Sequence, residues 1–412
     1  MTGKVHIIGA GLAGLAAALR FADEARAVAI HEAAPQAGGR CRSYFDSSLG
    51  MTIDNGNHLL LSGNRAALDF LREIGSEAEF VGPGSAEFSF LDLTSGETWR
   101  LRPNDGPIPW WILQSGRRVP GTRAADYLDI LRLLFAPQGA PIKAALNCRG
   151  LLYERLWRPF FLAALNTAPE EGAASLAAAI LRETLAKGGQ ACRPLVALNG
   201  LSSAFIAPAL RHLESKNVQI FFERRLLGIK FDAGRVASLD FADERIEVAA
   251  EDKVILAVPA PVAASLVPGL ITPQSFRAIV NGHFKITPPA GFPPILGVIN
   301  GTIEWLFAFP DRLSVTISAA DGLIDLSRDE LARRIWSDVA RATQIAQPMP
   351  AWQIIKEKRA TFAATAEEEL RRPKAQTAFS NLVLAGDWTA TGLPATIEGA
   401  IRSGFTAAEA IL

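Results

Sequence analysis

Residues 4–14, KVHIIGAGLAG, decide how this chain folds. An apolar run ending at Ile8 predicts a buried parallel strand. Gly9, Gly11 and Gly14 follow it with the G-x-G-x-x-G spacing of a dinucleotide-binding turn. In such a turn the first glycine permits the tight bend, the second lets a pyrophosphate approach the backbone, and the third lets the next helix pack against the strand.

A helix is predicted to open directly after this turn and to run through Leu15–Phe21. The N-terminus of a helix carries free N–H groups and the positive end of the helix dipole, so it favours anions. We therefore expect the phosphates of a dinucleotide to lie over the backbone of Leu12 and Ala13.

A second predicted strand, Ala27–His31, ends in Glu32. Glu32 lies 18 residues after Gly14, close to the spacing at which a carboxylate reaches a ribose hydroxyl of a bound dinucleotide. A glycine turn alone also occurs by chance as a purely structural feature. Here the strand, the helix and the acid are all in place, which favours the dinucleotide site.

The composition argues against several classes of function. Forty-two basic and forty-two acidic side chains balance, so neither nucleic-acid binding nor steering of acidic substrates is favoured. Cys41, Cys148 and Cys192 are widely spaced, which fits a reducing compartment with no disulfide framework and no zinc site. The longest uncharged run, 254–276, contains four prolines that would break a membrane-spanning helix. We expect a soluble cytoplasmic protein, with peripheral contact to the membrane as a further hypothesis.

A second glycine motif follows Glu32, in the run 33–43, AAPQAGGRCRS. A nicotinamide-binding domain has no need of a second glycine-rich phosphate clamp there. Gly38, Gly39 and Arg40 resemble the E-x(5–6)-G-G-R motif of FAD-dependent oxidoreductases of the amine oxidase and phytoene desaturase superfamily. The resemblance implies that the cofactor is FAD.

The C-terminal region resembles the same superfamily. Residues 382–385, LVLA, predict a strand, and Gly386 and Asp387 follow at its carboxyl end, where ligands of open α/β sheets collect. The resemblance implies that Asp387 binds the ribityl chain of the flavin. A last helix is predicted to begin near residue 397, and its N-terminus would stabilise negative charge on reduced flavin. The alternative is an ordinary capped helix. The flavin interpretation adds three expected cofactor contacts: Ala395, Thr396 and Ile397.

Five stretches narrow the resemblance: GAGLAGLAAA, GGRCRSY, IDNGNHLLLSGN, IIKEKRATFAAT and LAGDWTATGLPATIEGAIRSG. Together they resemble the hydroxysqualene dehydroxylases, the squalene-associated flavoproteins of bacterial hopanoid synthesis. The resemblance spans Val5 to Ile411 and implies reduction of hydroxysqualene to squalene with reduced FAD. We expect further cofactor contacts at Asn57, His58 and Leu226.

We predict an α/β fold with a discontinuous, Rossmann-like FAD-binding domain and an inserted α+β substrate domain. The FAD-binding domain is expected to comprise residues 1–80, 195–270 and 375–412. The substrate-binding domain is expected to comprise residues 81–194 and 271–374, which hold a predicted hairpin, a helical region and several further strands.

The implied chemistry requires an acid beside the departing hydroxyl, a surface that tolerates positive charge, and a tunnel that excludes water. His58 is the first candidate for the acid, because an imidazolium is a suitable donor near neutral pH. Asp54 competes with His58 or orients it, and Glu304 and Glu357 are further candidates. A lone histidine is nevertheless more often structural.

Aromatic side chains in the insertions offer faces for a cation, although aromatic side chains also dominate ordinary cores. The set is Phe88, Phe90, Trp110, Trp111, Trp157, Phe160, Phe161, Trp305, Phe307 and Phe309.

Trp110 and Trp111 lie close in sequence to Arg117 and Arg118, a composition typical of an interfacial membrane anchor. A C30 isoprenoid substrate favours such a contact. The alternative is a helix of the substrate domain that packs inward.

Three other functions stay open at this stage. An isoprenoid or carotenoid desaturase would use oxidised FAD and move hydride in the opposite direction, and the fold alone does not separate the two. Amine oxidation is less favoured, because the resembled oxidases place a tyrosine beside the flavin and this chain has none in its C-terminal third. A non-enzymatic carrier of prenyl lipids is disfavoured, because such carriers have lost the flavin motifs that are intact here. An electron donor for FAD is also required, and no motif identifies it.

Overall fold

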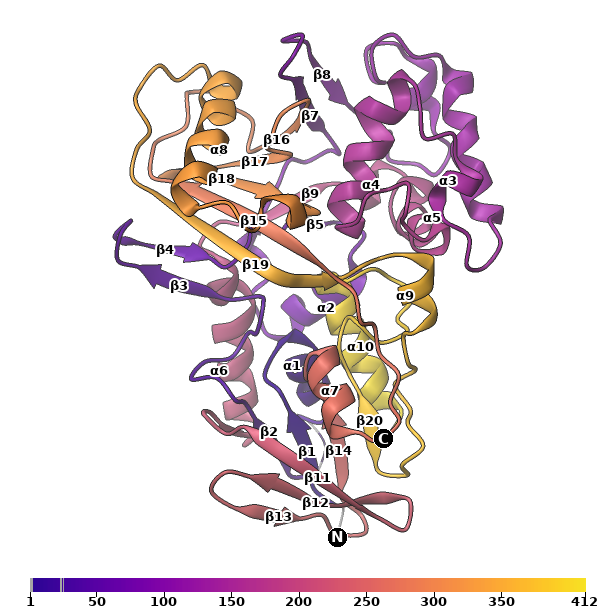
Figure 1. The fold of residues 1–412 in the computed structure, drawn as a ribbon, viewed down its shortest axis with the longest axis vertical. Coiled ribbons are helices and arrows are strands. Elements are labelled where there is room, and N and C mark those ends of the chain that lie inside the picture. Colours follow the sequence, from indigo (N-terminus) through magenta and orange to yellow (C-terminus); the bar gives the residue numbers. More distant parts are fainter. Residues whose placement is uncertain (1–2, 23, 25) are drawn as a thin grey trace.

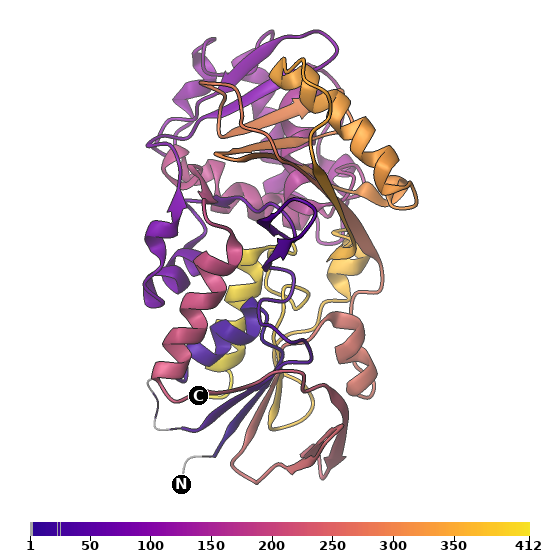
Figure 2. The same cartoon turned by 90° about the vertical axis from the view of Figure 1, so that its left-hand side faces the viewer.

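The structure is a computed structural model that describes residues 3–22, 24 and 26–412. It has a lower unit around a parallel sheet and an upper unit with a mixed sheet and a helical lobe beside it (Figure 1). The view turned by 90° shows the same two units along the long axis (Figure 2). The predicted α/β class, with a Rossmann-like sheet and an inserted α+β region, is confirmed.

Five parallel strands form the lower sheet, in the order β10-β2-β1-β14-β20. Ile7 in the central strand lies opposite Ile30 and Ile255, and all three side chains are fully buried. Strands buried on both faces read as continuous apolar runs, which is why the sequence pattern predicted them. In sheet order they are β10 (Gln219–Phe221), β2 (Val28–His31), β1 (Val5–Ile8), β14 (Lys253–Leu256) and β20 (Leu382–Leu384).

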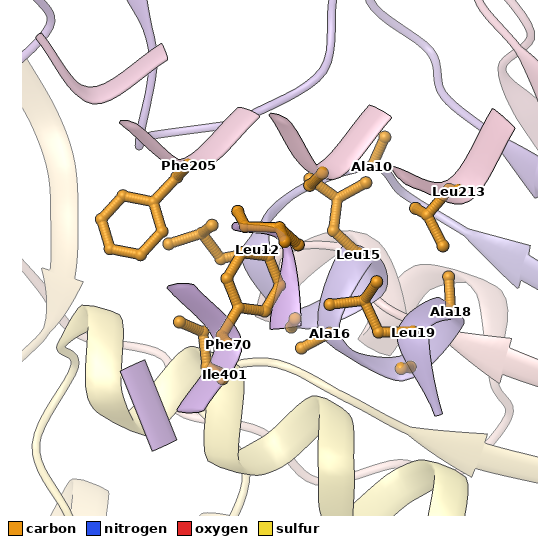
Figure 3. Close-up of a cluster of buried hydrophobic side chains, with 14 of the residues drawn as sticks. Ala10, Leu12, Leu15, Ala16, Ala18, Leu19, Phe70, Phe205, Leu213 and Ile401 are labelled. Carbon is orange, nitrogen blue, oxygen red and sulfur yellow. The ribbon is translucent and has the colours of Figure 1, made fainter. Parts of the chain in front are cut away.

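Helix α1 (Leu12–Leu19) begins directly after the glycine turn, three residues earlier than predicted, and every one of its side chains is buried. Figure 3 shows Leu12 and Leu15 among the side chains of Phe70, Phe205 and Ile401, which come from three other segments. This core joins the N-terminal motif to the C-terminal helix α10 (Ile397–Glu409) and to α2 (Arg65–Glu73) and α6 (Ala207–Ser215).

A three-stranded antiparallel sheet lies next to the parallel sheet and adds an aromatic stack. The ring of His31 lies 5.8 Å from that of His6, 5.3 Å from that of Phe221 and 4.8 Å from that of Phe241. Both histidines are buried, and within the described part of the chain neither nitrogen of His31 has a hydrogen-bond partner. The strands of this sheet are β11 (Leu226–Asp232), β12 (Arg235–Phe241) and β13 (Arg245–Glu247).

The upper unit holds a seven-stranded sheet, antiparallel except for the parallel pair β16 and β7. Helix α8 (Arg328–Thr343) packs against it, with the rings of Phe284 and Trp336 at 5.3 Å. Strand β19 was not predicted, because four consecutive charged residues, 356–359, interrupt its alternation of apolar and polar residues. In sheet order the strands are β19 (Trp352–Phe362), β15 (Phe276–Phe284), β18 (Arg312–Ile317), β17 (Trp305–Phe309), β16 (Ile295–Ile299), β7 (Phe88–Asp92) and β8 (Thr98–Leu101).

The helical lobe contains the proposed membrane anchor, and the structure corrects half of it. Trp111 is only 5% exposed, and its ring packs edge-on against Tyr127 at 5.2 Å. Trp110 is 58% exposed. The inward-packing alternative therefore holds for Trp111, whereas Trp110 stays available for an interfacial contact, because a short helix sends neighbouring side chains in different directions. Among the described residues no helix combines the length and the apolar character that a bilayer crossing requires.

The remaining elements complete the two units and the segments between them. The short strands are β3 (Ser43–Asp46), β4 (Met51–Asp54), β5 (Leu60–Leu61), β6 (Phe80–Val81) and β9 (Pro194–Ala197). The α-helices are α3 (Ile142–Ala145), α4 (Arg158–Leu165), α5 (Ala174–Glu183), α7 (Ala260–Leu266) and α9 (Ala366–Leu370). The 3-10 and π turns are η1 (Glu77–Glu79), η2 (Trp110–Leu113), η3 (Ala124–Phe135), η4 (Tyr153–Trp157), η5 (Leu185–Lys187), η6 (Gly189–Ala191), η7 (Ser202–Ile206) and η8 (Ala320–Leu323).

The histidine stack predicts a loss of stability in mild acid. Burial, followed by neighbouring positive charge, lowers the pKa of His6 to about 4 and that of His31 to about 3. The unfolded chain binds these protons at an ordinary pKa of about 6.5, so the free energy of unfolding falls as pH drops below 6.5. His31→Phe keeps a ring in the stack and should remove about 3 kcal/mol of this loss at pH 4, measured by urea unfolding at several pH values.

The matched control is His212→Phe on α6, outside the stack, which should keep the pH dependence of the wild type. An unchanged dependence in the His31 variant would show that the stack does not carry the effect.

Candidate functional site

The glycine turn combines close packing with open space. A Cβ atom at Gly9 would lie 2.5 Å from the carbonyl oxygen of Ala257, and one at Gly14 would lie 2.0 Å from that of Gly9. A Cβ atom at Gly11 would meet nothing within 4 Å. Gly9 and Gly14 therefore serve the packing of strand and helix, whereas Gly11 borders a space at the N-terminus of α1. The first N–H groups of a helix have no partner inside the helix, so the backbone of Leu12 is available to an anion there.

Glu32 lies at the carboxyl end of β2, as predicted. One of its carboxylate oxygens accepts a hydrogen bond from the backbone N–H of Ala10 at 2.7 Å, and the other accepts one from Ala34 at 2.8 Å. These bonds fix the carboxylate beside the glycine turn. Each oxygen keeps a further lone pair, so the carboxylate is able to accept hydrogen bonds from ribose hydroxyls.

The second glycine motif lies directly against the first. Gly38 forms a bridge with Gly11, and its N–H donates to the carbonyl of Ala10 at 2.8 Å. A Cβ atom at Gly39 would lie 3.5 Å from the Cα atom of Gly11. Both glycines have positive φ angles, 109° and 57°, which glycine adopts without strain. Two backbone segments without side chains therefore face one another, as a phosphate clamp requires.

Arg40 joins the two ends of the chain. One guanidinium nitrogen donates to both carboxylate oxygens of Asp387 at 2.7 Å, and another donates to the carbonyl of Ala360 at 2.6 Å. The charge of Asp387 raises the pKa of Arg40. Asp387 follows β20, so a cation and an anion of opposite termini meet at the carboxyl edge of the parallel sheet.

Arg372 is a positioning residue that the sequence analysis missed. Its guanidinium donates to the carbonyls of Asp387 and Thr389 and to the hydroxyl of Thr391, and it lies over the ring of Phe362 at 4.7 Å. The side chain is fully buried. It thereby holds the loop that carries Asp387. No sequence pattern indicates this role, because Arg372 lies in an ordinary charged run.

The start of α10 has the predicted cap. The hydroxyl of Thr396 accepts from the N–H of Gly399 at 3.0 Å, Ala395 precedes it half-buried, and Ile397 is buried. Leu226 is also buried, in the core beside β12. Leu226 and Ile397 therefore have packing roles in the structure, and any cofactor contact by them stays a prediction.

The loop that carries His58 is anchored on the upper sheet. The side-chain amide of Asn57 donates to the carbonyl of Val315 and to the hydroxyl of Thr316 at 3.1 and 3.2 Å. Asp54 instead accepts from the hydroxyl of Ser43 at 2.6 Å and from the N–H of Leu201 at 2.8 Å. The expectation that Asp54 orients His58 is not supported, because both of these partners lie elsewhere. Asp54 links β4 to the helix segment that begins after Leu201.

His58 is not the predicted imidazolium. Burial and the charge of Arg40 lower its pKa to about 4, so the ring is neutral at pH 7. Among the described residues no hydrogen bond to its ring is found, and part of its surface is accessible. The ring is therefore free to make a hydrogen bond to a ligand, but it is a weak proton donor near neutrality.

Glu304, unlike His58, has a pKa near neutrality. Burial raises its pKa to about 7, against the lowering effects of a hydrogen bond from the N–H of Ser318 at 2.9 Å and of the charge of Arg158. Glu304 thus keeps its proton over part of the neutral range. It precedes Trp305, which packs against the small apolar cluster that Leu59, the neighbour of His58, also contacts.

These residues fit FAD. The open space at Gly11, the paired glycine backbones, the fixed carboxylate of Glu32 and the free ring of His58 provide the donors and acceptors that a dinucleotide requires. Arg40 is 46% exposed, so part of its side chain stays accessible beside Asp387.

Gly11→Val tests this clamp. The new side chain would enter space that is open in the folded chain, at a φ of −72° that any residue adopts, so the fold should persist. The same side chain would occupy the space of the pyrophosphate, so FAD affinity should fall at least about tenfold. Flavin absorbance per protein and titration of the apoprotein with FAD measure the change.

The matched control is Gly84→Val, at a second glycine with open space, which should retain FAD. Equal FAD affinity in both variants would place the phosphates elsewhere.

Comparison with known proteins gives a consistent result. The sequence profile described as flavin containing amine oxidoreductase matches residues 12–412. A solved structure of a putative protoporphyrinogen oxidase from Exiguobacterium has a TM-score of 0.71 at 19% identity and covers 100% of this chain and 99% of its own. That likeness supports the fold.

Two sequence relatives are much closer. Hydroxysqualene dehydroxylase of Rhodopseudomonas palustris is 52% identical over 100% of this chain and 99% of its own length. Hydroxysqualene dehydroxylase of Zymomonas mobilis is 50% identical over 99% of this chain and 98% of its own length. The chain therefore belongs to the flavin-containing amine oxidoreductase family and, within it, to the hydroxysqualene dehydroxylases.

Proposed function

We propose that this protein reduces hydroxysqualene to squalene, with FAD as its cofactor. The observation that carries the proposal is the full-length identity of about half to proteins named for that reaction, together with a site whose residues fit FAD. In the reaction the C–O bond of the substrate breaks, the hydroxyl leaves as water after gaining a proton, and carbon gains a hydride. Reduced FAD supplies that hydride.

The two units divide this work. We propose that residues 1–80, 195–270 and 375–412 bind the cofactor, and that residues 81–194 and 271–374 bind the isoprenoid chain. The parallel sheet draws its strands from the first three segments, and the seven-stranded sheet draws its strands from the other two. The substrate would then lie where the two units meet.

Glu304 is the stronger candidate for the proton donor. A carboxyl group with a pKa of about 7 is an effective general acid near neutrality, whereas a histidine with a pKa of about 4 is not. We infer that His58 contacts the cofactor or substrate as a neutral ring, and that Asp54 supports its loop.

Trp305 is the aromatic side chain best suited to stabilise a cation. Six of the ten aromatic candidates are buried within apolar cores, as the structural alternative proposed: Phe90, Trp111, Trp157, Phe161, Phe307 and Phe309. Trp305 keeps some accessible surface and directly follows Glu304. Its indole nitrogen has no hydrogen-bond partner among the described residues. A ring face that borders the substrate would stabilise the charge that develops as water departs.

Anaerobic single turnover tests the reaction. Photoreduced enzyme mixed with hydroxysqualene should form squalene while the absorbance of oxidised flavin returns in equal amount. Inert reduced enzyme, combined with desaturation of an isoprenoid by oxidised enzyme, would replace the proposal with a desaturase.

The pH dependence separates the two candidate acids. If Glu304 donates the proton, turnover should fall as pH rises through about 7, because the carboxyl group loses its proton there. Glu304→Gln should lower turnover by about 100-fold or more and abolish the fall in turnover near pH 7, with flavin content unchanged.

His58→Ala is the comparison variant and should keep the fall in turnover near pH 7. If turnover still falls near pH 7 in Glu304→Gln but no longer does so in His58→Ala, the proton donor is His58.

The isoprenoid substrate also suggests where the protein is located in the cell. We infer peripheral contact with a lipid surface, to which Trp110 contributes and Trp111 does not.

A further inference from the structure

Exposed apolar side chains concentrate in one part of the helical lobe. Sixteen large hydrophobic side chains are exposed among the described residues, and seven of them lie within residues 108–151. Single exposed apolar residues are ordinary, whereas a concentration of them marks an interaction site. These seven form what is here called the apolar patch: Ile108, Trp110, Leu113, Leu128, Leu131, Phe135 and Leu151.

The segments that carry the apolar patch pack against one another. The ring of Trp111 contacts that of Tyr127 at 5.2 Å, which joins η2 to η3. A Cβ atom at Gly121 would lie 2.8 Å from Cδ2 of Leu151, so the start of η3 lies beside the helix that follows α3. The ribbon of this stretch lies in the upper lobe with α3 and α5, at the opposite end of the molecule from the C-terminus (Figure 1).

The helix η3 carries apolar side chains both on the side that faces the core and on the side that faces solvent. Tyr127 and Leu133 are 4% and 1% exposed and face the core. Leu128 and Leu131 are 57% and 48% exposed and lie three residues apart, which in a 3-10 helix of three residues per turn places them on one side. Phe135, at the end of the same helix, is 85% exposed. A helix that is apolar toward both the core and solvent requires a second apolar medium outside.

The charge around the apolar patch indicates which apolar medium would cover it. Residues 105–151 hold six basic and three acidic side chains, a net charge of +3 in a chain whose total is zero. Asp126 and Asp129 are already paired with Arg123 and Arg132, at 3.7 and 3.1 Å. Arg123 is 86% exposed and Arg132 is 72% exposed, so both reach solvent beside the apolar side chains. Apolar rings bordered by arginine match the interface of an anionic bilayer.

We propose that the apolar patch docks on the surface of an anionic lipid bilayer and that the protein takes its substrate from that bilayer. The second half of this statement rests on the proposed function, since a C30 isoprenoid resides in lipid rather than in water. The docking itself does not depend on the reaction.

Flotation with vesicles tests the docking. The wild-type holoprotein should float with vesicles of phosphatidylcholine and phosphatidylglycerol, and less with phosphatidylcholine alone. The double variant Leu131→Ser/Phe135→Ser should bind the mixed vesicles with an affinity at least about tenfold lower than that of the wild type. The double variant Arg123→Gln/Arg132→Gln should lose the preference for anionic vesicles and with it the sensitivity to salt.

The control is Leu227→Ser/Ile271→Ser, which removes two side chains of similar exposure, 60% and 66%, outside the apolar patch. It should float like the wild type. Flavin content and circular dichroism confirm that each variant is folded. Wild-type protein that stays in solution, or equal binding by the patch variant and the control, would overturn the proposal. So would a dimer in gel filtration that dissociates in the patch variant, because the patch would then join two copies of this chain.

Two activity assays separate this proposal from the proposed function. With hydroxysqualene dispersed in detergent, the patch variant should turn over like the wild type, because the site is intact. With hydroxysqualene in anionic vesicles, its turnover should fall in proportion to its binding. A wild-type protein that floats but shows no turnover in either assay would refute the reaction and leave the docking. Equal losses in both assays would refute delivery from the bilayer.

Discussion

The site depends on one ion pair between residues from opposite ends of the chain. Arg40 and Asp387 are 347 residues apart in sequence and pair at 2.7 Å at the carboxyl edge of the parallel sheet. Arg40 is nearly half exposed, so the pair contributes little to stability by itself. Its value is geometric, because it fixes the two cofactor motifs relative to one another.

Apolar packing beneath the pair makes that geometry rigid. A Cβ atom at Gly404 of α10 would lie 2.2 Å from the carbonyl oxygen of Ala13 in α1, so the two helices touch backbone to backbone. Such close approach leaves no room for either helix to shift. The carboxyl end of β1, the start of α1 and the loop after β20 are therefore packed into one body.

The cofactor half of the site was predictable from the sequence, and the substrate half was only partly so. Gly11 and Glu32 have roles that fixed spacing reveals, because strand, turn and helix are local. The role of Arg372 depends on carbonyl groups that only the folded loop brings together. The pKa of His58 and that of Glu304 depend on burial and on charges distant in sequence, so the residue types alone do not rank them as proton donors.

The two halves differ in their electrostatics, and this difference is the basis of the proposed chemistry. The cofactor side is rich in backbone N–H groups and charged pairs, which suit phosphates. In the other unit, burial favours the neutral form of Glu304, which would suit the proposed proton donor to a leaving hydroxyl.

A crystal structure of the holoprotein measures the central claim most directly. The account predicts the FAD pyrophosphate against Gly11 and Gly38, a ribose within hydrogen-bond distance of Glu32, and the isoalloxazine ring between the start of α10 and the loop of His58. Flavin density away from these groups, with the space at Gly11 filled by protein, would contradict it.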